Sequence, residues 1–153
     1  MKHTKYAINI LLWVFLIFMF ACGQNPEKIE ANSFAQAIEQ IKVGSQYQWI
    51  VVLPGLGCHG CIQEAEDFMK NHIEDERILF VLTKVSSLKI LQQKIDIRID
   101  EHSNIYVDRE DLFNIPTNNA IYPCVIQIKD DKVFTHSFQN PSNAALWKLE
   151  EQL

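Results

Sequence analysis

The chain has 153 residues, 48% of them hydrophobic, and a formal net charge of −5. This length suits one domain with a small core, and the apolar content excludes a disordered chain. Acidic side chains outnumber basic ones by 19 to 14. Because no basic patch is available to neutralise phosphates, we do not expect the protein to bind nucleic acid.

The first residues have the pattern of a targeting segment. Lys2 and Lys5 precede an uninterrupted apolar run over residues 10–20. This run is shorter than the ~20 residues that a membrane-spanning helix needs. We therefore predict a cleavable signal peptide at residues 1–21 rather than a permanent transmembrane helix.

The end of this run, Met19-Phe-Ala-Cys22, resembles a bacterial lipobox. The resemblance implies that Cys22 is lipidated and becomes the mature N-terminus, with residues 22–31 as a tether. We then expect export and lipid anchoring at a bacterial membrane, facing the periplasm, where disulfides persist. Plain secretion and an uncleaved anchor are the alternatives. Loss of residues 1–21 removes two lysines and no acid, which brings the net charge to −7.

Residues 32–153 alternate between helical and extended patterns. Ser33 and Gln36 form a capping-box signature that predicts a helix from about residue 32 to residue 42. The continuous apolar runs at residues 47–53 and 77–83 predict strands that are buried on both faces of a sheet.

Each of these strands leads into a helical pattern. One begins near Cys61, and the next opens at Ser86 or Ser87. Short extended pieces follow at residues 97–100 and 104–107, and the pattern does not decide which of them joins the sheet.

The C-terminal third predicts a hairpin and a last helix. The strands are expected at residues 124–129 and 132–138, joined by a tight turn at Asp130-Asp131. A closing helix then carries Leu146 and Leu149. The order of elements predicts an α/β fold, in which a mixed central sheet is flanked by helices in three layers.

Cys58 and Cys61 lie between the first predicted strand and the helix that follows it. Their spacing alone fits a redox-active disulfide, half of a metal site or a structural disulfide. At the start of a helix, however, Cys58 would lie among unpaired backbone N–H groups at the positive end of the helix dipole, which favours a thiolate. Cys61, one turn further on, could then resolve a mixed disulfide formed at Cys58.

This arrangement resembles the thioredoxin-like thiol–disulfide oxidoreductases over about residues 45–153. That family places a cis-proline opposite the active cysteines, before the strand that opens the final hairpin, and Tyr122-Pro-Cys124 occupies this place. The resemblance implies that Cys58 is the nucleophile, Cys61 the resolving cysteine and Pro123 the cis-proline. It implies no cofactor or metal beyond the Cys58–Cys61 disulfide. The implied partners are protein thiols and disulfides, with an electron donor or acceptor.

The chain departs from the thioredoxins proper around the motif. They have an aromatic residue before the first cysteine and a proline between the two, where this chain has Gly57 and Gly60. They also bury an acid in the preceding strand, and residues 47–53 contain none. We therefore expect a more flexible loop and a resolving cysteine without an internal base. Glu64 could replace that acid, although a solvated helix charge is its more ordinary role.

Two further side chains, His59 and Cys124, have open roles. A cationic His59 would stabilise the Cys58 thiolate and raise the oxidising power of the disulfide; otherwise it is an exposed loop residue. Cys124 is a buried small hydrophobe, a third redox partner or a soft metal ligand. The remaining histidines considered, which we expect at the surface or in the hairpin, are His72, His102 and His136.

The sequence therefore predicts a membrane-anchored extracytoplasmic thiol–disulfide oxidoreductase. One alternative is a non-catalytic lipoprotein of the same fold whose CxxC pair is a structural disulfide. The other is a Cu(I) or Zn(II) protein, with a ligand set that would comprise Cys58, His59, Cys61 and Cys124.

Overall fold

A computed structural model describes residues 25–153 of the chain. The predicted signal peptide and the lipidation site at Cys22 lie outside the described residues. Within the described part, no helix combines the length and the apolar character that crossing a membrane would need.

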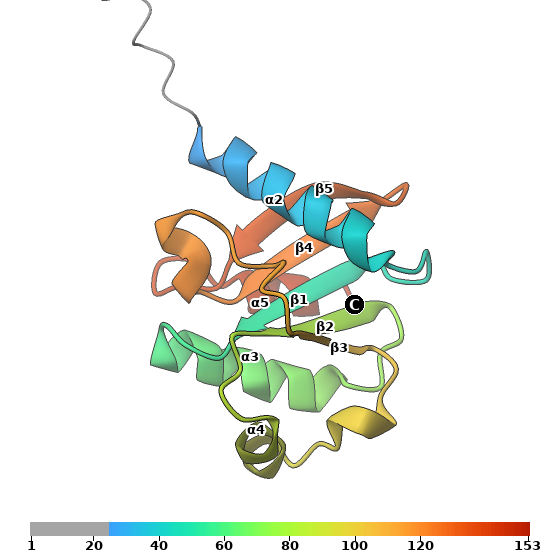
Figure 1. The fold of residues 1–153 in the computed structure, drawn as a ribbon, viewed down its shortest axis with the longest axis vertical. Helices are drawn as coiled ribbons and strands as arrows, with labels where there is room; N and C mark the ends of the chain where they lie inside the picture. Colours follow the sequence, from blue (N-terminus) through green and yellow to red (C-terminus); the bar gives the residue numbers. More distant parts are fainter. Residues whose placement is uncertain (1–24) are drawn as a thin grey trace, which may run out of the picture.

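The chain folds into a five-stranded sheet with four α-helices in the described residues (Figure 1). The helices are α2 (Pro26–Ile41), α3 (His59–His72), α4 (Leu88–Ile95) and α5 (Ala145–Glu150). The strands are β1 (Trp49–Pro54), β2 (Ile78–Thr83), β3 (Ile105–Asp108), β4 (Cys124–Lys129) and β5 (Lys132–Phe138). Two 3₁₀ turns, η1 (Ile99–Glu101) and η2 (Asn118–Ile121), precede β3 and β4.

The strand order in the sheet is β3-β2-β1-β4-β5. Strands β1, β2 and β3 run parallel, whereas β4 is antiparallel to β1 and β5 is antiparallel to β4. The predicted α/β class with a mixed sheet is therefore confirmed. Of the two short extended pieces, the second forms most of β3 and the first overlaps the start of the turn η1.

Different helices cover the two faces of the sheet. Helix α2 packs on one face, to which it contributes Phe34 and Ile38. Helices α3, α4 and α5 contribute Met69, Ile95 and Leu149 to the core on the other face. Every residue of β1 and β2 is buried, as the continuous apolar runs predict. The buried end of β1 therefore anchors the start of the loop that carries the cysteines.

Helix α2 begins earlier than the sequence predicts. It starts at Pro26, and the side chain of Asn25 caps it by accepting a hydrogen bond from the backbone N–H of Glu27 (3.0 Å). The predicted cap, Ser33, lies inside the helix, where its hydroxyl donates to a carbonyl one turn earlier. Asn followed by Pro is the stronger start signal, because a proline at the first helical position loses no hydrogen bond. Residues 26–31, which belong to the segment predicted as a tether, are therefore part of α2.

Candidate functional site

The candidate site is a disulfide at the start of α3. Cys58 and Cys61 are bonded to each other, with their Cα atoms 5.3 Å apart. Cys58 is the N-cap residue of α3, and Cys61 lies in the first turn of this helix. The placement of the pair between a buried strand and a helix is thus as the sequence predicts.

The two sulfurs differ in exposure and share a positive environment. Cys58 is partly exposed, whereas Cys61 is only 5% exposed. No side chain caps the first N–H groups of α3, and the first turn contains no acidic residue. Those N–H groups and the helix dipole therefore remain available to stabilise a thiolate at Cys58. The exposed cysteine is suited to attack a partner, and the buried one can be reached only from within the site.

The loop before Cys58 is held at both ends by the backbone of neighbouring segments. The N–H of Gly55 donates to the carbonyl of Thr83 (2.8 Å), and the N–H of Cys58 donates to the carbonyl of Ile121 (3.0 Å). Gly57 has a φ of +150°, and a Cβ there would overlap the Ile121 carbonyl. Glycine at this position permits a close approach of the loop to η2.

The bond before Pro123 is trans, because the described residues contain no cis peptide bond. The predicted cis-proline is wrong in this respect, although Pro123 does lie immediately before β4 and is fully buried. Trans is the lower-energy form of an X–Pro bond. The carbonyl of Pro123 accepts a hydrogen bond from the backbone N–H of Gln139 (2.8 Å), which fixes this segment to the end of β5.

Cys124 is not part of the disulfide site. It is the free cysteine of the described residues, is 2% exposed, and belongs to the core on the α2 face of the sheet, opposite to α3. Burial and, to a lesser degree, the charge of Glu30 raise the pKa of its thiol well above the ordinary value, against a backbone hydrogen bond involving Ser137. A buried, protonated thiol fits the interpretation as a small hydrophobe, and not that of a redox partner.

His59 is the first residue of α3, and its side chain is exposed. The described residues contain no group of three or more His, Cys, Asp or Glu side chains placed to hold a metal ion. The proposed ligand set of Cys58, His59, Cys61 and Cys124 is not brought together, because Cys124 faces the other side of the sheet.

The sequence analysis missed a buried polar cluster around Glu30 of α2. Its carboxylate accepts hydrogen bonds from the hydroxyl of Thr117 (2.6 Å) and the amide of Asn119 (2.8 Å), and pairs with Nε2 of His136 (3.1 Å). His136 lies in the hairpin strand β5, and the side chains of Glu30 and His136 are only 4% and 6% exposed. This cluster ties α2 to η2, whose Ile121 carbonyl holds the Cys58 loop.

Replacing Glu30 with glutamine should make folding less sensitive to acid. Burial alone would raise the pKa of Glu30, but hydrogen bonds from Thr117, His136 and Asn119 outweigh it and hold the pKa below its ordinary value of 4.5. A lowered pKa stabilises the folded state above the unfolded-state pKa, and this stabilisation is lost as the pH falls through the folded-state pKa. We expect Glu30→Gln to cost about 1–3 kcal/mol at neutral pH.

The difference between Glu30→Gln and the wild type should shrink in urea-unfolding series taken below a pH of about 4.5. Glu39→Gln is the matched control, because Glu39 is exposed on the same helix, and it should change the stability by less than about 0.5 kcal/mol. A constant difference at every pH would contradict this account of the cluster.

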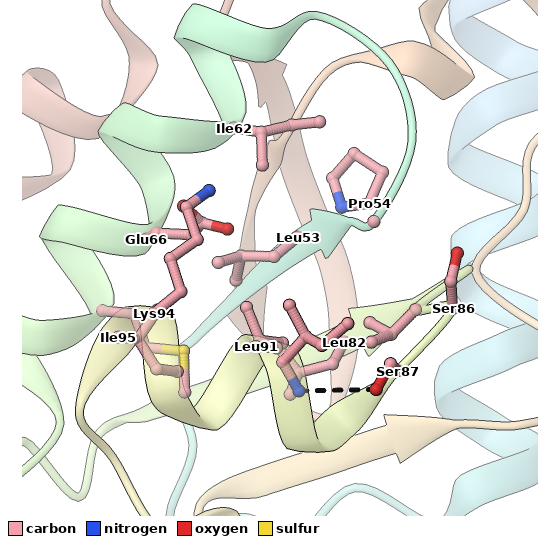
Figure 2. A pocket seen from close by; sticks show the side chains of 14 residues that line it. Leu53, Pro54, Ile62, Glu66, Leu82, Ser86, Ser87, Leu91, Lys94 and Ile95 are labelled. Atoms are coloured by element: carbon pink, nitrogen blue, oxygen red, sulfur yellow. Dashed lines mark hydrogen bonds and ion pairs between the residues drawn. The ribbon is translucent and has the colours of Figure 1, made fainter.

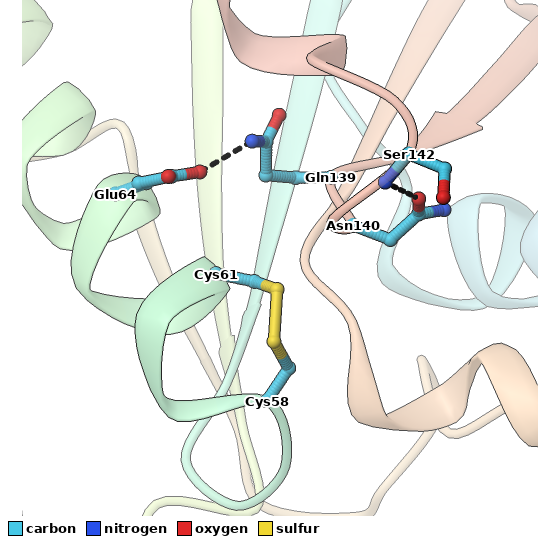
Figure 3. Close-up of a disulfide and its surroundings, with 6 residues drawn as sticks. All are labelled: Cys58, Cys61, Glu64, Gln139, Asn140 and Ser142. Carbon is cyan, nitrogen blue, oxygen red and sulfur yellow. Dashed lines mark hydrogen bonds between the residues drawn. A yellow bond between two sulfur atoms is a disulfide. The ribbon is translucent and has the colours of Figure 1, made fainter.

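A second polar pair lies beside the disulfide (Figure 3). Nε2 of Gln139 donates a hydrogen bond to the carboxylate of Glu64, three residues after Cys61 on α3. Gln139 is 7% exposed and lies directly after β5. No signal in the sequence joins these two residues, because 75 positions separate them along the chain.

An apolar cavity of about 190 Å³ opens between α3 and α4 (Figure 2). Pro54, Gly55 and Ile62 line the end of it that adjoins the cysteine loop, but neither sulfur is part of its lining. Its charged lining residues, Glu66 and Lys94, form an ion pair with each other. The cavity therefore offers an apolar surface next to the disulfide rather than a site for a charged ligand.

The fold and the site together define an α/β protein with a CxxC disulfide at a helix N-terminus. A scan against protein-family models found no match, and searches of curated proteins and of solved structures found no significant match either. The functional conclusion therefore depends on the geometry and chemistry of the site.

Proposed function

We propose that the protein is a thiol–disulfide oxidoreductase of the thioredoxin-like type. The observation that carries this proposal is the position of the disulfide: Cys58 caps α3 and is partly exposed, while Cys61 lies buried one turn further on. The strand order β3-β2-β1-β4-β5 and the buried Pro123 before β4 also support the resemblance.

The exchange would proceed through a mixed disulfide. In the reduced protein, the Cys58 thiolate attacks one sulfur of a substrate disulfide, and the other substrate sulfur leaves as a thiolate that takes up a proton. The Cys61 thiolate then attacks Sγ of Cys58, which re-forms the Cys58–Cys61 bond and releases the second substrate thiol. The substrate gains two electrons and two protons, which the CxxC pair loses. The same steps run in reverse oxidise a dithiol.

Protein disulfides are the proposed substrates. Large apolar side chains, Leu56 and Ile121, are 63% and 46% exposed on the two segments that meet at Gly57. Such a surface suits an extended or partly unfolded polypeptide better than a small charged thiol. We also propose that the protein is exported and lipid-anchored at Cys22, because its first residues have the pattern of a signal peptide that ends in a lipobox-like segment.

The direct test is the reduction of insulin by dithiothreitol in the presence of the protein. The wild-type chain should accelerate the reaction, and a variant carrying both Cys58→Ser and Cys61→Ser should not. Equal rates for the two proteins, with dithiothreitol and with reduced glutathione, would favour a non-catalytic protein with a structural disulfide.

His59→Ala should make the disulfide more reducing. A charged imidazole next to Cys58 stabilises the thiolate, and therefore the reduced form of the pair. Its removal should lower the reduction potential by about 30 mV or less.

Equilibration with glutathione redox buffers measures this change. His102→Ala is the control. His102 precedes β3, whereas the cysteine loop follows β1. Because these strands are parallel, the two lie at opposite ends of the strands. A potential that is unchanged, or raised, in His59→Ala would contradict the tuning role.

A further inference from the structure

We propose that Glu64 is the proton acceptor for the Cys61 thiol in the resolving step. This inference rests on the proposed exchange function and assigns it a residue in addition to the two cysteines. Strand β1 contains no acidic residue, so the strand beneath the site does not supply a carboxylate for this proton. The nearest acid that follows Cys61 along α3 is Glu64.

Glu64 has the right position on the helix. Residues three apart on an α-helix lie on the same face, with their Cβ atoms about 5–6 Å apart. Figure 3 shows that the side chains of Cys61 and Glu64 both project from α3 toward the segment that carries Gln139. A carboxylate in this place can reach a Cys61 thiol that has turned away from Cys58.

Gln139 holds the Glu64 carboxylate in place. The orientation of the Gln139 side chain is determined by its other hydrogen-bond partners. The backbone N–H of Leu146 donates to Oε1 of Gln139 (3.1 Å), and the backbone N–H of Gln139 donates to the carbonyl of Pro123 (2.8 Å). Because a backbone N–H can only donate, the amide oxygen must face Leu146 and the amide nitrogen must face Glu64. The amide nitrogen therefore presents an N–H group to the Glu64 carboxylate, which accepts the hydrogen bond.

The proton balance of the step is simple. In the mixed disulfide, Cys61 is a thiol. Its proton passes to the Glu64 carboxylate, and the resulting thiolate attacks Sγ of Cys58. The Cys58–Cys61 bond forms, the bond from Cys58 to the substrate sulfur breaks, and that sulfur leaves with the electron pair. It then takes a proton from Glu64, which returns the carboxylate, or from water, in which case Glu64 releases its proton to the solvent.

Other titratable groups line the surface hollow to which Glu64 and Gln139 belong. Asp67 and His72 lie on α3 and Glu150 lies on α5. His72 is paired with Glu150 (3.4 Å), and Phe68 stacks on the His72 ring. Asp67 is exposed and, unlike Glu64, makes no side-chain hydrogen bond in the described part of the chain. Asp67→Asn is thus a matched control, because it removes one negative charge from the same helix.

The test is the reaction of the reduced protein with 5,5′-dithiobis(2-nitrobenzoate) in a stopped-flow instrument. Attack by Cys58 releases the first thionitrobenzoate, and resolution by Cys61 releases a second one in a later phase. Cys61→Ser identifies the later phase by its absence. Because thionitrobenzoate leaves without needing a proton, the later phase reports on the deprotonation of Cys61.

Glu64→Gln should slow the later phase about tenfold near neutral pH, because an unassisted thiol is only a few per cent ionised there. The rates of Glu64→Gln and wild type should converge in alkali, where the thiolate forms without help. Asp67→Asn should follow the wild-type profile throughout.

An unchanged or faster later phase would exclude this role of Glu64. If Glu64 acted only through its charge, its removal would make Cys61 easier to ionise and the later phase faster. Such a result in Glu64→Gln would therefore overturn this inference without contradicting the proposed exchange function. The absence of a later phase in the wild type would instead remove the proposed function itself.

Discussion

Cys58→Ser should reduce insulin reduction by about 10²-fold or more, to the rate without protein, because a serine hydroxyl does not attack a disulfide at neutral pH. Cys61→Ser should behave differently. It retains the nucleophile but cannot resolve, so it should accumulate a mixed disulfide with insulin chains. Non-reducing electrophoresis and mass spectrometry of the trapped species measure this difference and locate the bond on Cys58.

The third cysteine provides the control for this experiment. Cys124→Ala removes a thiol that is buried on the opposite face of the sheet, so the exchange rate should remain within about twofold of the wild type. Equal effects of Cys58→Ser and Cys61→Ser with no trapped species, or a large loss in Cys124→Ala, would contradict the roles assigned here.

Gly57→Ala should destabilise the protein by about 2–5 kcal/mol, through backbone strain and the overlap of its Cβ with a neighbouring segment. The φ of Gly57 is +150°, and the overlap would be with the carbonyl of Ile121. Relief requires η2 to move away, which breaks the hydrogen bond from the N–H of Cys58 to that carbonyl. We therefore expect loss of exchange activity as well as a lower urea midpoint.

Gly60→Ala is the matched comparison within the same motif. A Cβ at Gly60 meets nothing within 4 Å, and the residue lies in the first turn of α3. Alanine there should leave the stability unchanged or raise it by up to about 1 kcal/mol. Similar urea midpoints for Gly57→Ala and wild type would show that the loop is not held as the structure indicates.

The sequence predicts those features that depend on local patterns. The buried runs give β1 and β2, the turn at Asp130-Asp131 gives the β4–β5 hairpin, and the strand-to-helix transition places Cys58 at a helix N-cap. Each of these signals is contained within a few consecutive residues, which is why it can be read without knowledge of the fold.

The errors arise where a distant segment decides the outcome. Nothing adjacent to Gly57 indicates that Ile121 leaves no room for the aromatic residue of the thioredoxins. Likewise, the Glu30–His136 pair spans 106 positions, and the amphipathic pattern of either element alone does not predict that both side chains are buried.

The start of α2 is a different kind of error, because two local signals competed. Ser33 with Gln36 suggested a cap, but Asn25 followed by Pro26 lies upstream and begins the helix. Once a helix has started, a serine inside it can bond to a preceding carbonyl, as Ser33 does. The weaker signal therefore has no effect on the structure.

The central claim is that the Cys58–Cys61 disulfide is redox-active rather than structural, and its reduction potential tests this most directly. The wild-type protein is equilibrated in glutathione or dithiothreitol buffers, and the reduced fraction of the pair is determined by alkylation and mass spectrometry. We expect a potential between about −120 and −270 mV, the range of proteins that exchange disulfides. A potential below about −300 mV, as in structural disulfides of secreted proteins, would contradict the proposed function.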